Sequence, residues 1–377
     1  GSDDMIQQVG QVMLYVNNLE QAKIFWVEKL GFELISDVNN GLRIITIAPT
    51  DEAQTSLVLH DKKKIQAMSP ELNLGTPSLM FYADHVESLY DEFKAKARAH
   101  QFAFRERELN NYYDEKNPQV MLTPDAAKKG LIFCDTYRGF IQNKFKSFGT
   151  SALFSNMLRS EHIPYNIFTP MEEDLSAATA LFNEVIGGGI SRIDKIHIEF
   201  AGKSPDRSEY LKDSTSFDTF IEYTTTENAK GGIGIEVKYT ENGYRIGVKE
   251  KKDIEDPNGK YRQVSEESNY FIPSLNITSF IKANHLRQIW RNHILGYSML
   301  RKGEIKRFHY IHLYPEGNKH FHQYAIPEYK QLLTEKGCNS FIDITYESLF
   351  RLIDSCFKQD EQRKWLEYLK KRYIVEL

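Results

Sequence analysis

The stretch GGIGIEVKYTE, residues 231–241, decides the fold of the C-terminal half of this chain. Apolar residues stand on both sides of Glu236, a pattern typical of a central strand that is covered on both faces. Side chains two residues apart on a strand point the same way, so Glu236 and Lys238 share one face. Buried charges need an ion-pair partner or a metal. The alternative is that these two charges mark only the solvated face of a strand.

A second strand, expected at Phe217–Thr224, carries Asp218. The residues 228–232 favour a hairpin between the two strands, which would set Asp218 opposite Glu236. Two carboxylates that converge there would bind Mg²⁺ or Mn²⁺ through hard oxygen ligands, and Lys238 would add a donor for the nucleophile or a phosphate. The ion would lower the pKa of an attacking water and neutralise charge on the phosphate. The expected metal ligands come from three positions: Asp218, Glu236 and Val237.

The elements around these strands predict the order αβββαβ, an α/β and α+β arrangement. A polar insert at residues 243–268 is expected to be an exposed loop. The expected elements, in chain order, are the helix Pro170–Ile186, the strands Ile193–Phe200, Phe217–Thr224 and Ile233–Thr240, the helix Ile277–Leu300 and the strand Phe308–Tyr314.

The long helix carries polar residues on the stripe that faces the core. Gln288 and Asn292 are four residues apart and project from the same face, which also holds Ile281, Leu295 and Met299. Polar groups on such a stripe need partners. Gln288 is therefore either a residue of the catalytic cluster or a hydrogen-bonding link between helix and sheet.

The order of these elements, with Asp on the second strand and Glu-x-Lys on the third, resembles the PD-(D/E)XK nuclease superfamily, which has the restriction-endonuclease-like fold. The segments that carry the resemblance span residues 163–350 and include NIFTPMEEDLSAATALFNEVIG, TSFDTFIEY, GGIGIEVKYTE, QIWRNHILGYSML and IHLYPEGN. It implies catalytic roles for Asp218, Glu236, Lys238 and Gln288. One departure is that Phe217 stands before Asp218, where the superfamily pattern has Pro.

The N-terminal part has a different pattern, βαβββ, which occurs about twice. The first copy has a strand ending at Val16, a helix at Leu19–Leu30 and three short strands. In the second copy, a strand is expected at Ser78–Tyr82, followed by a helix at Val86–Ala97 and strands at Gln119–Leu122 and Leu131–Cys134.

The sequences of these segments resemble those of the vicinal oxygen chelate (VOC) superfamily, which has the glyoxalase and bleomycin-resistance fold. VMLYVNNLEQAKIFWVEKLGFEL, SLMFYADHVESLYDEFKAK and LIFCDTYRGFIQ carry the resemblance. It implies paired βαβββ modules, and it places Gln11 and Ser78 where the family has metal ligands. Because neither residue is a good ligand, we expect a sensor, substrate-positioning or dimerisation module. The expected domains are residues 5–145 (VOC-like), 146–163 (connector) and 164–377 (nuclease).

The composition is that of an ordinary soluble globular protein. The chain has 377 residues and a net charge of −4, which excludes a non-specific polycation but leaves room for a local basic groove. Three cysteines without a CxxC pair indicate no disulfide framework, and so a reducing cytoplasm. No apolar run approaches the roughly 18 residues of a membrane span.

The sequence thus predicts a Mg²⁺- or Mn²⁺-dependent endonuclease in the cytoplasm, with DNA favoured as substrate and a structured RNA such as tRNA left open. By analogy of architecture, a nuclease fused to a binding module resembles bacterial anti-phage effectors. We expect a phage-derived or small-molecule trigger at the VOC-like domain, a homo-oligomer and no membrane partner. The alternative is a small-molecule binding or resistance protein that acts through the VOC-like domain.

Overall fold

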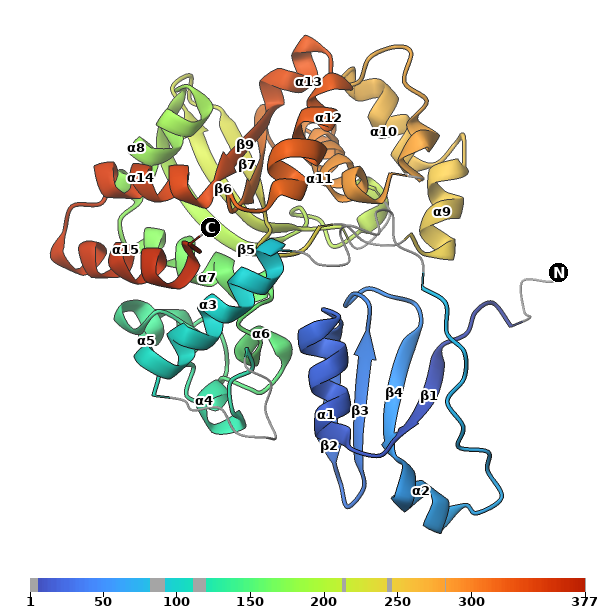
Figure 1. Ribbon diagram of the computed structural model, residues 1–377. Coiled ribbons are helices and arrows are strands. Elements are labelled where there is room, and N and C mark those ends of the chain that lie inside the picture. The colour runs from blue at the N-terminus through green and yellow to red at the C-terminus, as the bar shows by residue number, and fades with distance from the viewer. Residues whose placement is uncertain are drawn as a thin grey trace. The chain divides into compact units, whose positions relative to one another are not determined.

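The computed structural model describes residues 6–81, 92–110, 120–211, 215–242, 246–281 and 283–376 (Figure 1). Contacts divide the chain into two compact units. Unit 1 comprises Gly1–Ala95 with Asp114–Pro118, and unit 2 comprises Lys96–Tyr113 with Gln119–Leu377. Unit 1 has a four-stranded sheet and unit 2 a five-stranded sheet, so the expected class of two mixed α/β domains is confirmed.

The described part of unit 1 contains one βαβββ module. Its sheet has the order β1-β4-β3-β2, in which β1 and β4 run parallel and the other neighbours antiparallel. Helix α1 begins after Asn18, whose side chain accepts a 3.0 Å hydrogen bond from the main-chain nitrogen of Gln21. The elements are β1 (Gln11–Val16), α1 (Leu19–Lys23) with a π-helical continuation (Ile24–Lys29), β2 (Glu33–Asn39), β3 (Arg43–Ala48), β4 (Ser56–Asp61) and α2 (Lys62–Met68).

The second βαβββ copy departs from the expectation within the described residues. The strand expected at Ser78–Tyr82 is wrong in its described part, residues 78–81, which form no strand. The expected helix at Val86–Ala97 lies partly outside them, and its described part belongs to α3 (Glu92–Glu108). Of the strand expected at Gln119–Leu122, only a bridge between Met121 and Asn156 is described. The strand expected at Leu131–Cys134 is wrong, because that segment is a turn that leads into helices. The helices of this region are α4 (Pro124–Lys128), α5 (Arg138–Gln142), α6 (Ala152–Ser155) and α7 (Ile163–Ile167).

An apolar core explains why these residues are helical. Aromatic side chains of this region pack around Phe133, and Ile198 and Tyr368 from later elements pack against them. The expected connector, residues 146–163, is part of this core, since Phe148 and Met157 are buried. The boundary between the two compact units lies inside α3, between Ala95 and Lys96. It therefore precedes the connector at residues 146–163 that the sequence suggests.

The sheet of unit 2 has the order β5-β6-β7-β8-β9. The pairs β5–β6 and β6–β7 are antiparallel, whereas the pairs β7–β8 and β8–β9 are parallel. Figure 1 shows α8 and α14 on one side of this sheet and α11 and α12 on the other. The strands are β5 (Ile190–Phe200), β6 (Phe217–Thr225), β7 (Lys230–Val237), β8 (Arg307–Tyr314) and β9 (Phe341–Thr345).

The helices of unit 2 refine the expected bounds. The first expected helix is split into a 3₁₀ turn (Thr169–Glu173) and α8 (Leu175–Ile186), because Asp174 caps α8 through a 3.1 Å bond from the nitrogen of Ala177. The prediction that the polar insert is an exposed loop is wrong in its described part, because that part forms two helices that bury Ile254 and Tyr261. The further helices are α9 (Val248–Glu255), α10 (Lys260–Ser268), α11 (Asn284–Lys302), α12 (Ile326–Gln331), α13 (Glu335–Ser340), α14 (Tyr346–Cys356) and α15 (Asp360–Tyr373).

Two glycines let aromatic rings lie across the central strand β7. A Cβ atom added to Gly234 would stand 2.4 Å from the ring of Phe217, and one added to Gly232 would stand 2.4 Å from the ring of Phe220. A side chain at either position would displace these rings, so the pattern Gly-x-Gly before Glu236 is a packing requirement.

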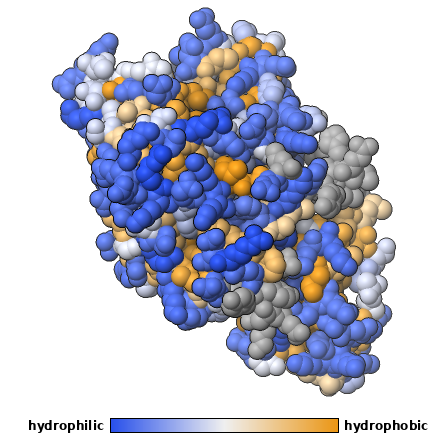
Figure 2. All heavy atoms as spheres, turned by 60° about the vertical axis from the view of Figure 1, so that its left-hand side comes forward, coloured by the Kyte–Doolittle hydropathy of each residue, from blue (hydrophilic) through white to orange (hydrophobic). Residues whose placement is uncertain are grey.

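The face that Figure 2 presents is mostly hydrophilic where it is coloured, with scattered apolar patches. None of the described helices is long and apolar enough to cross a membrane.

Candidate active site

The hairpin of β6 and β7 brings Asp218 and Glu236 together. The register pairs Thr219 with Ile235, so the preceding residue Asp218 and the following residue Glu236 lie opposite each other. Oδ2 of Asp218 accepts a 2.7 Å hydrogen bond from the main-chain nitrogen of Val237. The chain folds this way because Asn228 adopts a left-handed backbone conformation (φ 61°) in the turn, which Asn tolerates better than most residues.

Glu236 is buried, and donors reach both of its oxygens. Its side chain is 4% exposed. Oε1 accepts a 2.5 Å hydrogen bond from Nε2 of Gln288, and Oε2 accepts one of 2.9 Å from Nδ2 of Asn292. Both amides come from α11, four residues apart, and therefore from one face of that helix. The polar stripe expected on this helix thus faces the acidic pair.

Lys238 completes the group. Its Nζ atom lies 3.4 Å from Oε1 of Glu236 and donates a short hydrogen bond to Oε1 of Gln288. Lys238 directly follows β7, and its main-chain nitrogen bonds to the carbonyl of Leu313 on β8, which fixes the end of the strand. The structure therefore brings together Asp218, Glu236, Lys238 and Gln288, the four residues expected to be catalytic.

The electrostatics of the pair favour a bound cation. Burial, and then the neighbouring Glu236 carboxylate, raise the pKa of Asp218 well above its ordinary value. Burial also raises the pKa of Glu236, against the opposing effect of Lys238. A positive ion between the two carboxylates would relieve this cost.

The residues present fit a hard divalent ion. Two carboxylates and nearby main-chain oxygen atoms are the donor types that Mg²⁺ and Mn²⁺ take, and Mg²⁺ is often held by only one or two carboxylates plus phosphate oxygens and waters. Across the described ranges, no group of three or more His, Cys, Asp or Glu side chains is arranged to hold a metal.

Three further residues surround this group, and the sequence did not mark them as parts of the site. Asn292 touches Glu236, as described above. His312 on β8 is the parallel-strand partner of Glu236, and its Nδ1 atom lies 2.8 Å from the hydroxyl of Tyr310. Burial and the charge of Lys238 hold the pKa of His312 well below its usual range. Tyr310 and His312 alternate on a core strand, and this pattern of polar groups was a signal that they face a common partner. Only the register of β7 and β8 identifies that place as the one beside Glu236.

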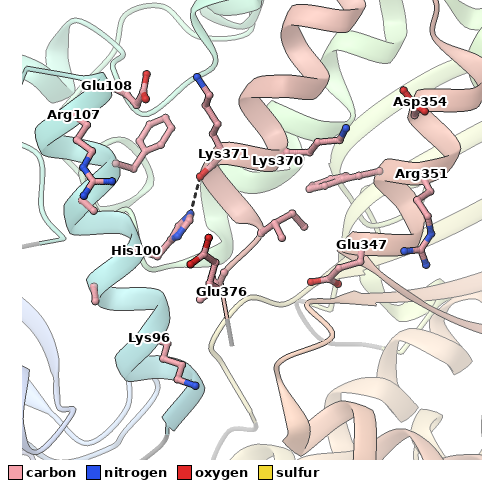
Figure 3. A pocket seen from close by; sticks show the side chains of 16 residues that line it. Lys96, His100, Arg107, Glu108, Glu347, Arg351, Asp354, Lys370, Lys371 and Glu376 are labelled. Atoms are coloured by element: carbon pink, nitrogen blue, oxygen red, sulfur yellow. Dashed lines mark hydrogen bonds between the residues drawn. The ribbon is translucent and has the colours of Figure 1, made fainter.

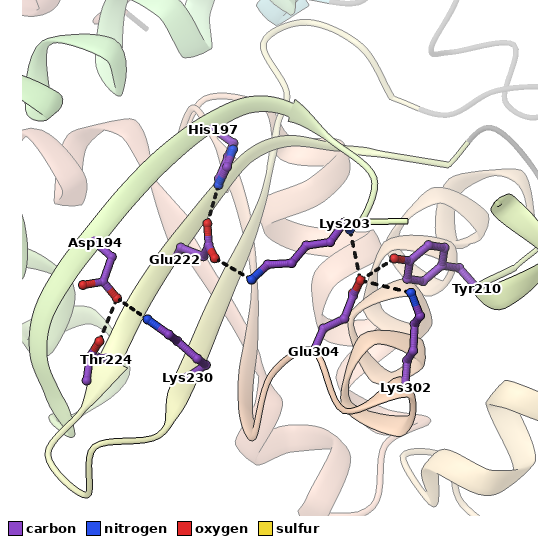
Figure 4. A network of polar contacts seen from close by, with 9 residues as sticks. All are labelled: Asp194, His197, Lys203, Tyr210, Glu222, Thr224, Lys230, Lys302 and Glu304. Atoms are coloured by element: carbon purple, nitrogen blue, oxygen red, sulfur yellow. Dashed lines mark hydrogen bonds and ion pairs between the residues drawn. The ribbon is translucent and has the colours of Figure 1, made fainter. Parts of the chain in front are cut away.

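Two other polar regions of unit 2 lie outside this group. On β5 and β6, Glu222 binds His197 at 2.6 Å and Lys203 at 2.9 Å, and Asp194 binds Thr224 at 2.7 Å (Figure 4). A cleft of about 1110 Å³ is lined by residues of α3, α14 and α15 and includes His100, whose Nε2 lies 2.7 Å from the carbonyl of Lys371 (Figure 3). None of the four residues expected to be catalytic lines this cleft.

In unit 1, the two positions that correspond to metal ligands of the VOC superfamily carry Gln11 and Ser78, and both residues are exposed. Neither the amide of glutamine nor the hydroxyl of serine is a usual ligand for Ni²⁺ or Zn²⁺. At these two positions, the residues therefore do not fit the metal chemistry of that superfamily.

Comparisons with known proteins agree with the division of the chain into two parts of different fold. A family model described as the PD-(D/E)XK nuclease superfamily matches residues 87–375, and one described as the Glyoxalase/Bleomycin resistance protein/Dioxygenase superfamily matches residues 8–115. The uncharacterized protein YetH of Bacillus subtilis (strain 168) is 33% identical over 92 residues, which cover 24% of this chain and 72% of YetH. A crystal structure of UcmS2 is 38% identical with a TM-score of 0.15, over 15% of this chain and 44% of that one, so the chain spans less than half of it.

Proposed function

Because the chain belongs to the PD-(D/E)XK nuclease superfamily, we propose that it is a Mg²⁺- or Mn²⁺-dependent endonuclease that hydrolyses phosphodiester bonds at Asp218, Glu236 and Lys238. The observation that carries this proposal is the meeting of two carboxylates at the end of the central strand, where burial raises the pKa of both groups and the Glu236 carboxylate raises that of Asp218 further. Lys238 stands beside them at 3.4 Å from Glu236.

Each residue has a separate task in this proposal. A bound divalent ion supplies water activation and neutralises charge on the phosphate. Asp218, Glu236 and the main-chain oxygen of Val237 would hold the ion, and the hydrogen bond from the nitrogen of Val237 orients Asp218. Lys238 donates to the nucleophile or to a phosphate oxygen. Gln288 bonds both Glu236 and Lys238 and so keeps the acid and the base in a fixed relation.

We assign nucleic acid as the substrate, with DNA favoured because the superfamily serves mostly DNA cleavage, and with a structured RNA such as tRNA as the second candidate. The N-terminal region, which matches the glyoxalase superfamily, serves as a sensor or regulatory module. Its trigger is a phage-derived or small molecule, the protein acts in the cytoplasm as an anti-phage effector, and VOC-like modules pair in a homo-oligomer. Catalysis through the VOC-like domain is disfavoured by Gln11 and Ser78.

The test is incubation of the pure full-length protein with plasmid DNA and with total RNA, in Mg²⁺, Mn²⁺ or EDTA. We expect cleavage of one substrate class that requires the cation and disappears in Asp218→Ala, Glu236→Ala and Lys238→Ala. Glu222→Ala is the matched control, because Glu222 is an acid on the same strand as Asp218 but pairs with His197 and Lys203. Cleavage by Glu236→Ala at the wild-type rate would refute the proposed site.

A further inference from the structure

Asn292 lies in the site, but the proposed function above gives it no role. Its amide nitrogen donates to Oε2 of Glu236 at 2.9 Å, while Gln288 donates to Oε1 at 2.5 Å. Asn292 is 1% exposed. One amide therefore holds each oxygen of the same carboxylate, and the two amides come from successive turns of α11.

Asn292 has polar neighbours on the side away from Glu236. Its side chain lies close to the hydroxyl of Tyr310, and that hydroxyl lies 2.8 Å from Nδ1 of His312. Tyr310 and His312 are both fully buried on β8, the strand next to Glu236. A continuous line of contacts thus runs from Glu236 through Asn292 and Tyr310 to His312, and it links α11 to two strands of the sheet.

This arrangement restricts how Glu236 can turn. A carboxylate offers about four lone-pair directions. Two amide N–H groups occupy one direction on each oxygen, so the plane of the carboxylate is fixed. The directions that these amides and Lys238 leave open are available to other partners. A carboxylate held at one oxygen alone could rotate about its last bond.

We infer that Asn292 is a positioning residue, which sets the Glu236 carboxylate for the divalent ion that it shares with Asp218. Tyr310 and His312 lie behind Asn292 and support it. The inference rests on the proposed function. Asn292 does not touch the ion or the substrate in this scheme. It acts through Glu236, as the outer partners of metal ligands do, and loss of such a partner usually costs about 10–100-fold in metal affinity or activity.

The experiment measures Mn²⁺ binding to full-length, EDTA-treated and dialysed protein by calorimetry, together with kcat and KM for cleavage. We expect Asn292→Ala to bind Mn²⁺ about 10–100-fold more weakly and to lower kcat, with KM for the nucleic acid unchanged. Tyr310→Phe keeps the ring and removes only the hydroxyl behind Asn292, so it should weaken Mn²⁺ binding by a smaller factor. It tests the inference even where Asn292→Ala does not fold.

Ser298→Ala is the control, because Ser298 is buried on the same helix and bonds only to the carbonyl of Leu295 within it. Its Mn²⁺ affinity should equal that of the wild type. Wild-type Mn²⁺ affinity in both Asn292→Ala and Tyr310→Phe, with wild-type protein that cleaves, would overturn the inference and leave the proposed function standing. A wild-type protein that neither binds Mn²⁺ nor cleaves would overturn both.

Discussion

Nζ of Lys238 lies 3.4 Å from Oε1 of Glu236, so the one basic residue of the site stands against the more deeply buried acid. This contact offsets only part of the cost of burying two carboxylates, because the pKa of Asp218 and the pKa of Glu236 both remain raised. Without a cation, the site is therefore a local source of instability. The first two predictions follow from that imbalance.

In EDTA, the stability of the wild-type protein should depend on pH in a definite direction. Since the folded-state pKa of Asp218 lies above its ordinary value, the folded protein binds more protons than the unfolded one between those two values. The contribution of Asp218 to the stability of the folded protein therefore falls as pH rises from about 4 through the folded-state pKa of Asp218. Thermal unfolding of Asp218→Asn should show a flatter pH dependence and a higher melting temperature at neutral pH. An equal or steeper fall in the variant would contradict the raised pKa.

Mn²⁺ should stabilise the folded wild-type protein. At a concentration of about 100 times the dissociation constant, a ligand that binds only the folded state adds about 2.7 kcal/mol. We expect the thermal shift to vanish in Asp218→Ala and Glu236→Ala and to persist in Lys238→Ala, which removes a donor but no oxygen ligand. A lost shift in Lys238→Ala alone would show that the lysine, and not the acids, controls metal binding.

Gln288→Ala should lower the cleavage rate by about 10–100-fold without abolishing it, because Glu236 and Lys238 keep their direct contact. The initial rate in saturating Mg²⁺ is the measurement. Arg301→Ala is a suitable control on the same helix, since Arg301 pairs with Glu267 away from the site. A rate equal to that of the wild type would assign Gln288 to the helix-to-sheet contact alone.

Gly234→Ala should destabilise the protein by about 1–3 kcal/mol, because the new methyl group would meet the ring of Phe217 at 2.4 Å. Gly139 is the matched control. It lies in helix α5 with no atom near an added Cβ, so Gly139→Ala should be neutral or stabilising by up to about 1 kcal/mol. Denaturant unfolding of both variants gives the comparison, and equal stabilities would show that Phe217 relaxes without cost.

A fragment that starts at residue 164 should fail to fold as a stable domain, whereas residues 96–377 should fold. The shorter fragment lacks most of the aromatic core around Phe133, and it exposes the buried faces of Tyr165 and Tyr368. Soluble yield and cooperative thermal unfolding distinguish the two fragments. A stable, cooperative fragment 164–377 would support the boundary that the sequence suggests.

The local pattern of the chain was enough to predict the hairpin. Alternation, two glycines and the spacing of Glu236 and Lys238 are read within one short segment, and the antiparallel pairing with the strand of Asp218 needs only a short turn. The same is true of the helix that carries Gln288, because four-residue spacing defines its face without knowledge of the neighbours.

Contacts between distant segments were not predictable in this way. Tyr310 and His312 lie on the strand expected at Phe308–Tyr314, which gives them no visible link to the site. Only the parallel register of β7 and β8 places them beside Glu236. Strand β9 was not expected, because it has only five residues between two helices. The segment Leu131–Cys134, which is a turn, was predicted to be a strand because periodicity alone does not identify the structure of a short apolar run.

The separation of the site residues along the chain has a consequence for folding order. Asp218 and Val237 are 19 residues apart, whereas Glu236 is 52 residues from Gln288 and 56 from Asn292. Short loops close at a lower entropic cost than long ones, so the hairpin can form while α11 is still undocked. Until that helix docks, the carboxylate of Glu236 stays hydrated and free to rotate. The refolding chain would thus complete its backbone scaffold first, and acquire a competent metal-binding geometry only in a late step.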